Sequence, residues 1–384
     1  VPNKFELIGV TDGAVGVDLR PMFSWQAATD PDGDAITYDV YLGTAEDASE
    51  IYAENLNTNS LEITERLSTY ESYYWKVAAK DVKSAMVSSE INEFTTRGLS
   101  LPTTPVTAAA LFSERSHHAT VVFKDKMWLI GGYDESARND IWNSADGINW
   151  AKVTSAAPFS ARYGNSTAVF DNKLWVIGGY DGSLKNDVWY SADGITWTIA
   201  TSTAPFSKRY FHATTVFDNK LWVIGGHDET EKNDVWYSAD GITWKEATAS
   251  APFTERLEST ALVFENKLWV IGGTERGQDK TDLWYSTDGI TWTEGIAATP
   301  FSKRFGSTTT VFDNKLWVIG GGFHDNANAK DIWYSKDGIT WSEATSNAQF
   351  SARNGHSTTV FDNKLWGIGG FQGDTLKNDV WAFD

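Results

Sequence analysis

The chain has 384 residues, a formal net charge of −19 and no Cys. This charge argues against nucleic-acid binding, because phosphate contacts need clustered Lys and Arg. The lack of Cys excludes disulfides, thiolate metal sites and cysteine nucleophiles. Aromatic residues make up 14% of the chain, too many for a disordered protein, and no apolar run in it is long enough to span a membrane as a helix.

Residues 1–97 read as a domain of short strands separated by turn-rich segments. Apolar positions alternate along these strands, which is typical of strands that bury one face. Roughly seven short strands in a segment of this length predict a β-sandwich. The clearest strands are expected at residues 22–25, 36–42, 60–63, 73–79 and 91–95.

Trp25, the Tyr-Asp-Val-Tyr strand at 38–41 and the Tyr-Trp-Lys-Val strand at 74–77 resemble a fibronectin type III domain, which has an Ig-like sandwich fold. We expect Trp25 and Trp75 to lie in its core. The turn with Asp30, Asp32 and Asp34 has two interpretations. Three carboxylates could bind calcium, but Asp and Gly are also common turn residues, and the distal Glu of an EF-hand loop is missing.

From about residue 98 onward, a segment of the type Lys-Leu-Trp-Val-Ile-Gly-Gly recurs six times. The steps between successive first glycines are 47, 47, 47, 48 and 49 residues. A fixed period near 50 indicates radial repetition of small β-sheets. The glycine pairs are Gly131-Gly132, Gly178-Gly179, Gly225-Gly226, Gly272-Gly273, Gly320-Gly321 and Gly369-Gly370.

Each repeat reads as four strands, which we call a to d. In the second repeat, strand a covers 166–170, strand b 173–177, strand c includes 187–190 and strand d begins near 195–197. The two-residue turn Asp171-Asn172 favours a tight hairpin between a and b. Four antiparallel strands per repeat correspond to one propeller blade.

The Gly-Gly pair, the Asp-x-Trp of strand c and the later Trp of strand d resemble Kelch repeats over about residues 101–384. The resemblance implies an all-β chain: a fibronectin-like sandwich at 1–97 and a six-bladed Kelch β-propeller at 98–384. Of the 19 Trp, 17 recur at three repeat positions, so we expect them to fill the space between sheets. The sixth repeat ends after strand c, so we expect residues 101–110 to supply the missing strand d.

Length variation between the repeats is confined to the loop between strands b and c. The interval from the first Gly to the Asp of Asp-x-Trp is 9, 9, 9, 10, 11 and 10 residues in successive repeats, whereas the other intervals compared are constant. The b–c loop shares a face with the d–a loop because neighbouring strands are antiparallel. Binding surfaces on repeat scaffolds are built from varied loops, so this face is the candidate binding face.

Aromatic and polar residues are frequent in these two loops. Exposed rings beside polar side chains suit both sugars and protein partners. The alternative at each position is that the ring packs against an adjacent loop. The candidate ligand-binding residues are Tyr133, Tyr163, Tyr180, Tyr210, Phe211, His227, Glu258, Arg276, Phe305, Phe323, His324, Asn354 and Phe371.

An arginine and, in three repeats, a histidine recur beside these loops. Strict recurrence favours a structural role for the arginines, by bonding to a loop carbonyl or carboxylate, although some Kelch propellers hold acidic ligands with arginines near this position. Three histidines near an axis could bind metal, but hydrogen bonding to the backbone is the simpler interpretation. The sets are Arg115, Arg162, Arg209, Arg256, Arg304 and Arg353, and His118, His212 and His356.

We predict a non-catalytic, monomeric binding protein that docks a glycan or a protein on the b–c and d–a face, without cofactor or metal. A secreted, periplasmic or cell-surface location is expected, compatible with a processed leader or lipid anchor upstream of Val1. One alternative is a sugar epimerase or mutarotase on a Kelch propeller, using Glu258 or Glu275 as base with Arg256 or Arg276. Another is a purely protein-interaction scaffold. The cross-linked cysteine cofactor of galactose oxidase, which also joins these two domain types, cannot form here.

Overall fold

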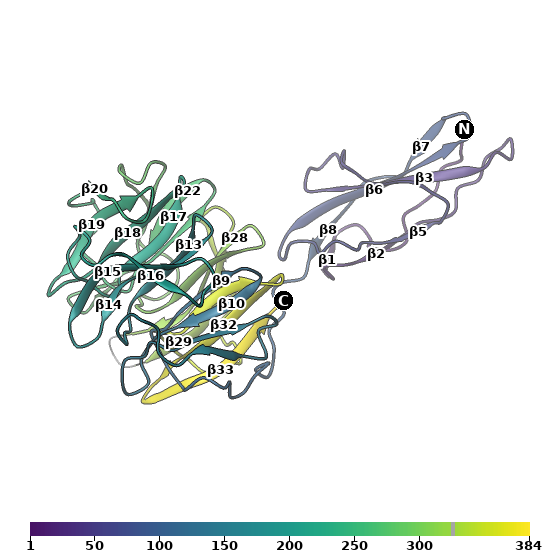
Figure 1. Cartoon of the computed structure of the whole chain (residues 1–384). Coiled ribbons are helices and arrows are strands. Elements are labelled where there is room, and N and C mark those ends of the chain that lie inside the picture. The colour runs from purple at the N-terminus through teal and green to yellow at the C-terminus, as the bar shows by residue number, and fades with distance from the viewer. Residues whose placement is uncertain (324–326) are drawn as a thin grey trace. The chain divides into compact units, whose positions relative to one another are not determined.

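The computed structural model describes residues 1–323 and 327–384, and these form two compact units, Val1–Leu99 and Ser100–Asp384. All regular elements in the described residues are β-strands (Figure 1). The described residues therefore include no helix of the length and hydropathy that a membrane crossing needs.

The N-terminal unit contains a six-stranded and a two-stranded sheet. The large sheet has the order β1-β8-β6-β3-β4, with β7 paired to β6, and the small sheet pairs β2 with β5. Apolar residues alternate along β3 and β6, which is why one face of the large sheet is buried. The strands are β1 (Ala14–Val17), β2 (Met22–Ser24), β3 (Ile36–Gly43), β4 (Ile51–Leu56), β5 (Ser60–Glu62), β6 (Ser72–Asp81), β7 (Met86–Ser88) and β8 (Asn92–Thr96).

The core of this unit lies around Trp25 and Trp75, which are both fully buried, as the sequence predicts. The Phe23 and Trp75 rings stack with centroids 4.2 Å apart, and Trp25 meets Tyr38 edge-on at 5.4 Å. Because Phe23 lies on β2 and Trp75 on β6, these contacts join the two sheets.

The C-terminal unit consists mainly of four-stranded antiparallel sheets, each built from strands that follow one another along the chain, except that a short strand pair interrupts the fourth sheet. The four-stranded sheets are β9 (Ala119–Phe123), β10 (Lys126–Ile130), β11 (Ile141–Ser144) and β12 (Ala151–Thr154); β13 (Ser166–Phe170), β14 (Lys173–Tyr180), β15 (Leu184–Ser191) and β16 (Trp197–Thr201); β17 (Ala213–Phe217), β18 (Lys220–His227), β19 (Glu231–Ser238) and β20 (Trp244–Thr248); β21 (Thr260–Phe264), β22 (Lys267–Ile271), β25 (Leu283–Ser286) and β26 (Thr293–Ile296); and β27 (Thr308–Phe312), β28 (Lys315–Gly322), β29 (Asn328–Ser335) and β30 (Trp341–Thr345). A three-stranded sheet follows, with β31 (Ser357–Phe361), β32 (Lys364–Gln372) and β33 (Thr375–Phe383), and the short pair β23 (Thr274–Glu275) and β24 (Gln278–Asp279) extends one loop.

The first strands of these sheets line a central axis. Strands β9, β13, β17, β21, β27 and β31 contact one another in this order, and β31 also contacts β9, so the series closes on itself. The arrangement is that of a β-propeller, in which each sheet packs face to face on its neighbours (Figure 1).

Residues 100–112 lie beside the last strand, β33. Thr107 pairs with Val380, Val106 N donates to Val380 O at 2.9 Å, and Asn378 Nδ2 donates to the Ala110 and Phe112 carbonyls at 2.9 and 3.1 Å. In the second sheet the corresponding Asn186 contacts the segment after its own fourth strand in the same way. Residues from the start of the unit thus make contacts with β33 that the fourth strand and the segment after it make in the second sheet.

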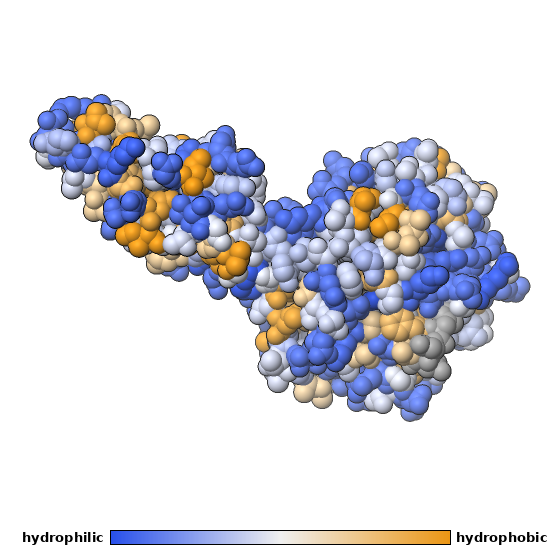
Figure 2. Space-filling view, turned by 180° about the vertical axis from the view of Figure 1, so that it is seen from behind, coloured by the Kyte–Doolittle hydropathy of each residue, from blue (hydrophilic) through white to orange (hydrophobic). Residues whose placement is uncertain are grey.

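Tryptophans of the second strands fill the space between neighbouring sheets. Trp128 is 3% exposed, its Nε1 donates to Phe123 O at 2.8 Å, and its ring lies against Gly194 of the next sheet, where a Cβ would be only 2.2 Å from Cη2. A glycine is therefore required at the turn that faces this Trp. Large hydrophobic residues are also scattered over the surface of both units, among hydrophilic ones (Figure 2).

Candidate functional site

The b–c loops and d–a loops pair with each other at one face of the propeller. In each repeat, the residue after the recurrent Arg forms a β-bridge with the residue after the Gly-Gly pair. These bridges bring the two varied loops of each sheet into direct contact. They are Ser116–Tyr133, Tyr163–Tyr180, Tyr210–His227, Leu257–Thr274, Phe305–Gly322 and Asn354–Phe371.

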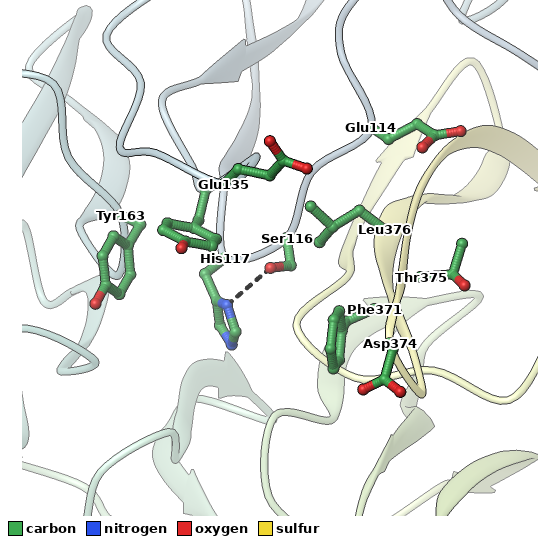
Figure 3. Close-up of a pocket in the computed structure, with 10 residues that line it drawn as sticks. Glu114, Ser116, His117, Glu135, Tyr163, Phe371, Asp374, Thr375 and Leu376 are labelled. Atoms are coloured by element: carbon green, nitrogen blue, oxygen red, sulfur yellow. Dashed lines mark hydrogen bonds between the residues drawn. The ribbon is translucent and has the colours of Figure 1, made fainter.

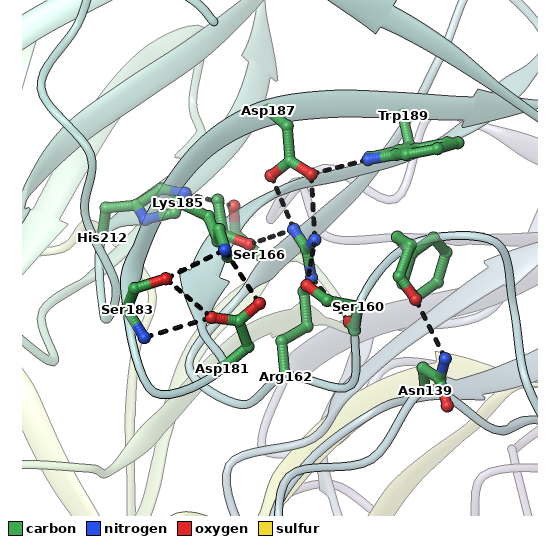
Figure 4. A network of polar contacts seen from close by, with 12 residues as sticks. Asn139, Ser160, Arg162, Ser166, Asp181, Ser183, Lys185, Asp187, Trp189 and His212 are labelled. Atoms are coloured by element: carbon green, nitrogen blue, oxygen red, sulfur yellow. Dashed lines mark hydrogen bonds and ion pairs between the residues drawn. The ribbon is translucent and has the colours of Figure 1, made fainter. Parts of the chain in front are cut away.

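The recurrent arginines hold these loops by hydrogen bonds to a carbonyl and to a carboxylate of the same sheet. Arg162 is 1% exposed and binds both carboxylate oxygens of Asp187, at 2.7 and 2.9 Å, and the Gly178 carbonyl at 2.9 Å (Figure 4). Trp189 Nε1 donates to the same carboxylate at 2.8 Å, which explains the Asp-x-Trp spacing. Equivalent Arg–Asp pairs occur in all the repeats, so these guanidinium groups are occupied within the fold.

In five of these pairs the arginine changes the pKa of its Asp partner in the same direction. Burial alone would raise the pKa of Asp187, but the hydrogen bonds and charge of Arg162 outweigh it and hold that pKa below its usual value. The same balance lowers the pKa values of Asp140, Asp282, Asp331 and Asp379. The ionised carboxylate is therefore the form that the fold stabilises.

Predicted aromatic residues from the first three repeats form one continuous cluster. Tyr163 is at its centre, with ring centroids 5.3 Å from Tyr133, 5.6 Å from Tyr180 and 6.2 Å from Tyr210. The Tyr210 ring in turn lies 4.4 Å from Phe211 and 5.6 Å from His227. We call these residues the aromatic cluster: Tyr133, Tyr163, Tyr180, Tyr210, Phe211 and His227.

Beside the cluster, a ring of left-handed residues surrounds the axis. The second residue after each Arg has φ between 52° and 61°; it is Gly in three repeats and His117, Phe211 or Glu258 in the others. Their backbones hydrogen-bond from sheet to sheet, for example Phe211 N to Gly164 O at 2.8 Å. A non-glycine residue with this φ is uncommon, and such residues often mark functional sites.

The three glycines of this ring leave room for the three larger side chains. A Cβ on Gly355 would lie 2.8 Å from His117 Nε2, one on Gly306 3.0 Å from Glu258 Oε2, and one on Gly164 2.9 Å from Phe211 Cδ1. The larger side chains thus lean over neighbouring glycines, toward one another.

His117 and Glu258 meet above the axis, with Nε2 and Oε1 3.7 Å apart. The Glu258 side chain is 11% exposed, and burial, with a smaller contribution from the Asp279 charge, raises its pKa to about 7. Burial lowers the pKa of His117 to about 4. Both shifts favour the uncharged forms between these two values, so this centre carries no fixed positive charge at neutral pH.

His117 and Glu258 both line a depression of about 190 Å³ at the axis. Asn165, Ser259 and the three recurrent histidines also line it. Burial lowers the pKa of each of these histidines to about 3, and the positive charge of a nearby arginine adds to this effect. Each histidine Nε2 bonds a hydroxyl of the adjacent sheet: His118 to Ser357 at 2.9 Å, His212 to Ser166 at 2.8 Å and His356 to Thr308 at 3.0 Å. The sequence predicts that these histidines bond to the backbone. At Nε2 they bond instead to a side chain of the neighbouring sheet and so link two sheets.

A larger pocket of about 620 Å³ opens between the last and first sheets on the same face (Figure 3). Tyr133 and Tyr163 of the aromatic cluster line it together with Phe371 of the last sheet. His117 forms part of its wall and is fixed by Ser116, whose Oγ is 3.1 Å from His117 Nδ1. The remaining lining residues are Glu114, Glu135, Asp374, Thr375 and Leu376.

The other predicted residues are spread over the face rather than gathered in the cluster. Phe323 lies 5.8 Å from the Arg304 guanidinium, and Asn354 Nδ2 donates to Asn328 Oδ1 at 2.9 Å. Phe305 is half-buried beside Gly322. Arg276 projects into solvent, 3.9 Å from Glu255, and His324 lies outside the described residues.

Charged residues of the b–c loops pair with one another. Asp181 lies 2.8 Å from Lys185 and accepts a hydrogen bond from Ser183 (Figure 4). Asp134 pairs with Arg138 and Asp228 with Lys232 in the same way, so these charges stabilise the loop hairpins.

In the N-terminal unit, Asp30, Asp32 and Asp34 approach one another closely enough to be a candidate metal group. However, Asp30 Oδ1 accepts the Asp32 backbone N–H at 2.8 Å, and Lys83 Nζ lies 2.8 Å from Asp34 Oδ2. These contacts agree with the turn interpretation and already compensate part of the charge that would bind calcium.

His117 and Asn165 are site residues that the sequence reasoning missed. The available signal was their alignment: His117 stands where three other repeats have Gly, and Asn165 where three others have His. Both differences become visible only when the repeats are compared at each position after the Arg.

Comparisons with known proteins place the repeats in a family. The comparison with curated proteins gives no match. A solved structure titled "Structure of YjhT" superposes with a TM-score of 0.59 at 15% identity, covering 72% of this chain and 96% of that chain, which supports the fold alone. The KLHDC2/KLHL20/DRC7 Kelch-repeats domain matches residues 79–252, 189–344 and 258–384. Since these matches together span most of the sequence, the chain belongs to this Kelch-repeat family.

Proposed function

We propose that the C-terminal unit is a six-bladed Kelch propeller whose last blade is completed by the segment before its first strand. The cyclic contacts of the innermost strands support this number of blades. The hydrogen bonds from Asn378 to the carbonyls of Ala110 and Phe112 support the completion, because they match those of Asn186 in a four-stranded sheet. Completion would protect the edge of β33 from pairing with other chains.

The N-terminal unit would be a fibronectin III-like sandwich that serves as a spacer. Two sheets around the buried Trp25 and Trp75 support this assignment. A secreted or surface location, and a monomeric state, remain predictions from the sequence.

The function that the geometry supports best is non-catalytic docking of a protein on the b–c and d–a face. The observation that carries this proposal is the aromatic cluster, which crosses three repeats without interruption. Tyr residues with half-exposed rings are frequent anchors of protein interfaces because they bury a large area at low entropic cost. The scaffold beneath is held by buried Arg–Asp pairs, so the loops are preorganised for binding.

A glycan is the second candidate ligand. The same rings could stack on a sugar face, and polar groups such as His227 stand beside them. The epimerase or mutarotase alternative has less support from the geometry: Arg256 is bound to Asp282, Glu275 to Lys280, and Arg276 is near Glu255. Glu258 has a pKa that burial raises to about 7, whereas the hydrogen bond from Lys280 lowers the pKa of Glu275.

Ligand selection can test the docking proposal. A phage-displayed peptide library is selected on the full chain, and a glycan array is probed with the same protein. We expect selected peptides to lose at least tenfold in affinity in the Tyr163→Ala/Tyr210→Ala double variant. Tyr133→Ala, whose ring is 39% exposed, is a milder second variant, and thermal stability is measured for each. Ile242→Ser is the control, because Ile242 is 54% exposed on a c–d turn of the other face.

Selected peptides that bind the aromatic variants as tightly as the original chain would refute the proposed face. Binding to glycans, lost in the same variants, would replace the protein ligand with a glycan. Sugar turnover that disappears in Glu258→Gln would favour the enzymatic alternative.

A further inference from the structure

The charged side chains that line the 620 Å³ pocket between the last and first sheets are all negative. Three of its lining residues, Glu114, Glu135 and Asp374, are acidic and exposed, and its described lining contains neither Lys nor Arg. His117, the remaining titratable nitrogen, is uncharged at neutral pH because burial lowers its pKa to about 4. A concave surface with one sign of charge concentrates counter-ions of the opposite sign.

These carboxylates differ from the loop carboxylates of neighbouring repeats. Asp181 and Asp228 are neutralised by Lys185 and Lys232, four residues later. In the second repeat, Asp181 comes directly after the bridge residue Tyr180. In the last repeat, Gln372 holds the equivalent position after Phe371. Within the described part of the chain, Glu114, Glu135 and Asp374 form no ion pair. The negative charge of the pocket is therefore available to a ligand.

The same pocket has aromatic walls. Tyr133 and Tyr163 meet edge-on, with centroids 5.3 Å apart and planes at 68°. Phe371 comes from the last sheet and lines the pocket with Tyr163 (Figure 3). Aromatic rings combined with carboxylates suit a cation carried on an apolar stem, because the ring face attracts the charge and the stem packs along the apolar ring surface.

We propose that this pocket receives a Lys or Arg side chain from a basic segment of a protein partner. The inference rests on the proposed docking function and specifies its partner. The stem of the side chain lies against Tyr133 and Phe371, and its charged end reaches the carboxylates at the rim. A pocket of this volume holds more than one side chain, so neighbouring residues of the segment also enter.

A protein segment fits the surroundings better than an isolated small amine. Tyr163 belongs both to the pocket lining and to the aromatic cluster, so a chain anchored in the pocket continues over the cluster without leaving the face. The net charge of −19 also favours the approach of a basic partner over long range.

Tetralysine with blocked ends and a fluorescein label tests the inference by fluorescence anisotropy on the full chain at physiological salt. Its counterpart with all side chains acetylated keeps the stems but loses the charge. The pocket variant is Glu114→Gln/Glu135→Gln/Asp374→Asn. The matched control removes three exposed charges from the N-terminal unit: Glu54→Gln/Glu62→Gln/Glu65→Gln.

We expect tetralysine to bind, the acetylated peptide to bind at least tenfold more weakly, and the pocket variant to lose at least fivefold while the control keeps its affinity. An equal loss in both triple variants would overturn the inference, because only the overall field would then act. Binding of tetramethylammonium in competition with the peptide, at similar affinity, would assign the pocket to small amines instead.

The result also separates this inference from the docking proposal. If tetralysine does not bind, but neutral or acidic library peptides bind in a Tyr163- and Tyr210-dependent manner, the basic partner is wrong and the docking face stands. If no peptide depends on those residues, the docking proposal itself fails.

Discussion

Replacing Asp187 by Asn should strongly destabilise the propeller. Arg162 is 1% exposed and binds this carboxylate through two hydrogen bonds, and Trp189 donates a third. Asn keeps the size of the side chain but turns an N–H donor toward the guanidinium and leaves its buried charge uncompensated. Removing one partner of a buried ion pair costs about 3–5 kcal/mol. We therefore expect a loss of about 3–5 kcal/mol in the free energy of unfolding.

Urea unfolding followed by Trp fluorescence measures this loss, because 17 of the 19 Trp belong to the repeats. The control is Asp171→Asn, which neutralises an exposed carboxylate paired with Lys173 and should change stability by less than about 0.5 kcal/mol. Arg162→Met and the Arg162→Met/Asp187→Asn double variant complete a double-mutant cycle. Its coupling energy measures the interaction between Arg162 and Asp187.

The pH dependence provides an independent check of the same pair. The pKa of Asp187 is lowered in the folded state, so its contribution is present above the ordinary value of 3.8 and is lost as pH falls through the folded pKa. The difference between the original chain and Asp187→Asn should thus narrow below about pH 4. A loss in Asp187→Asn no larger than in Asp171→Asn, or a difference that widens in acid, would refute the reasoning.

Three further predictions concern the repeats. His212 has a folded pKa of about 3 against 6.5 normally, so the unfolded chain binds more protons between these values and stability falls as pH decreases. His212→Asn, copying Asn165, should flatten the stability–pH curve by about 1.4 kcal/mol per pH unit below pH 6, and an unchanged slope would contradict this. Gly194→Ala should cost at least about 1 kcal/mol more than Gly182→Ala in urea unfolding, because both glycines have positive φ but a Cβ meets a Trp ring only at Gly194. A chain of residues 112–384 should unfold at a lower temperature than 98–384, since it lacks the segment bound to β33; equal midpoints would disprove closure by that segment.

The repeat pattern was sufficient to predict much of the propeller. The glycine spacing located the strands, and Asp171-Asn172 form the expected hairpin turn with φ of 49° and 53°. The invariant position of Arg162 indicated a structural role, which its bonds to Asp187 and Gly178 confirm. These features are predictable because each repeat solves the same packing problem, so recurrence itself carries the information.

The candidate site was less predictable because it depends on contacts between different repeats. Sequence reasoning selected Tyr163 and Tyr210 as members of one face but could not tell which rings touch. His117 can lean over Gly355 and meet Glu258 because Gly355, in another repeat, has no side chain. The sequence around His117 does not indicate this contact. The aromatic cluster likewise depends on the distances between the loops of three repeats, which only the structure gives.

Function in such a molecule is encoded by differences between its repeats. Positions that recur, such as Arg162 and Asp187, are engaged in holding the sheets and cannot be released for a ligand without a large loss of stability. Positions that differ, such as Gln372 and Asp374, alter loop charge while leaving that framework intact. A negative pocket can therefore arise between the last and first sheets by substituting only loop residues. The ligand preference of this face should accordingly follow its loop residues, independently of the stability of the sheets.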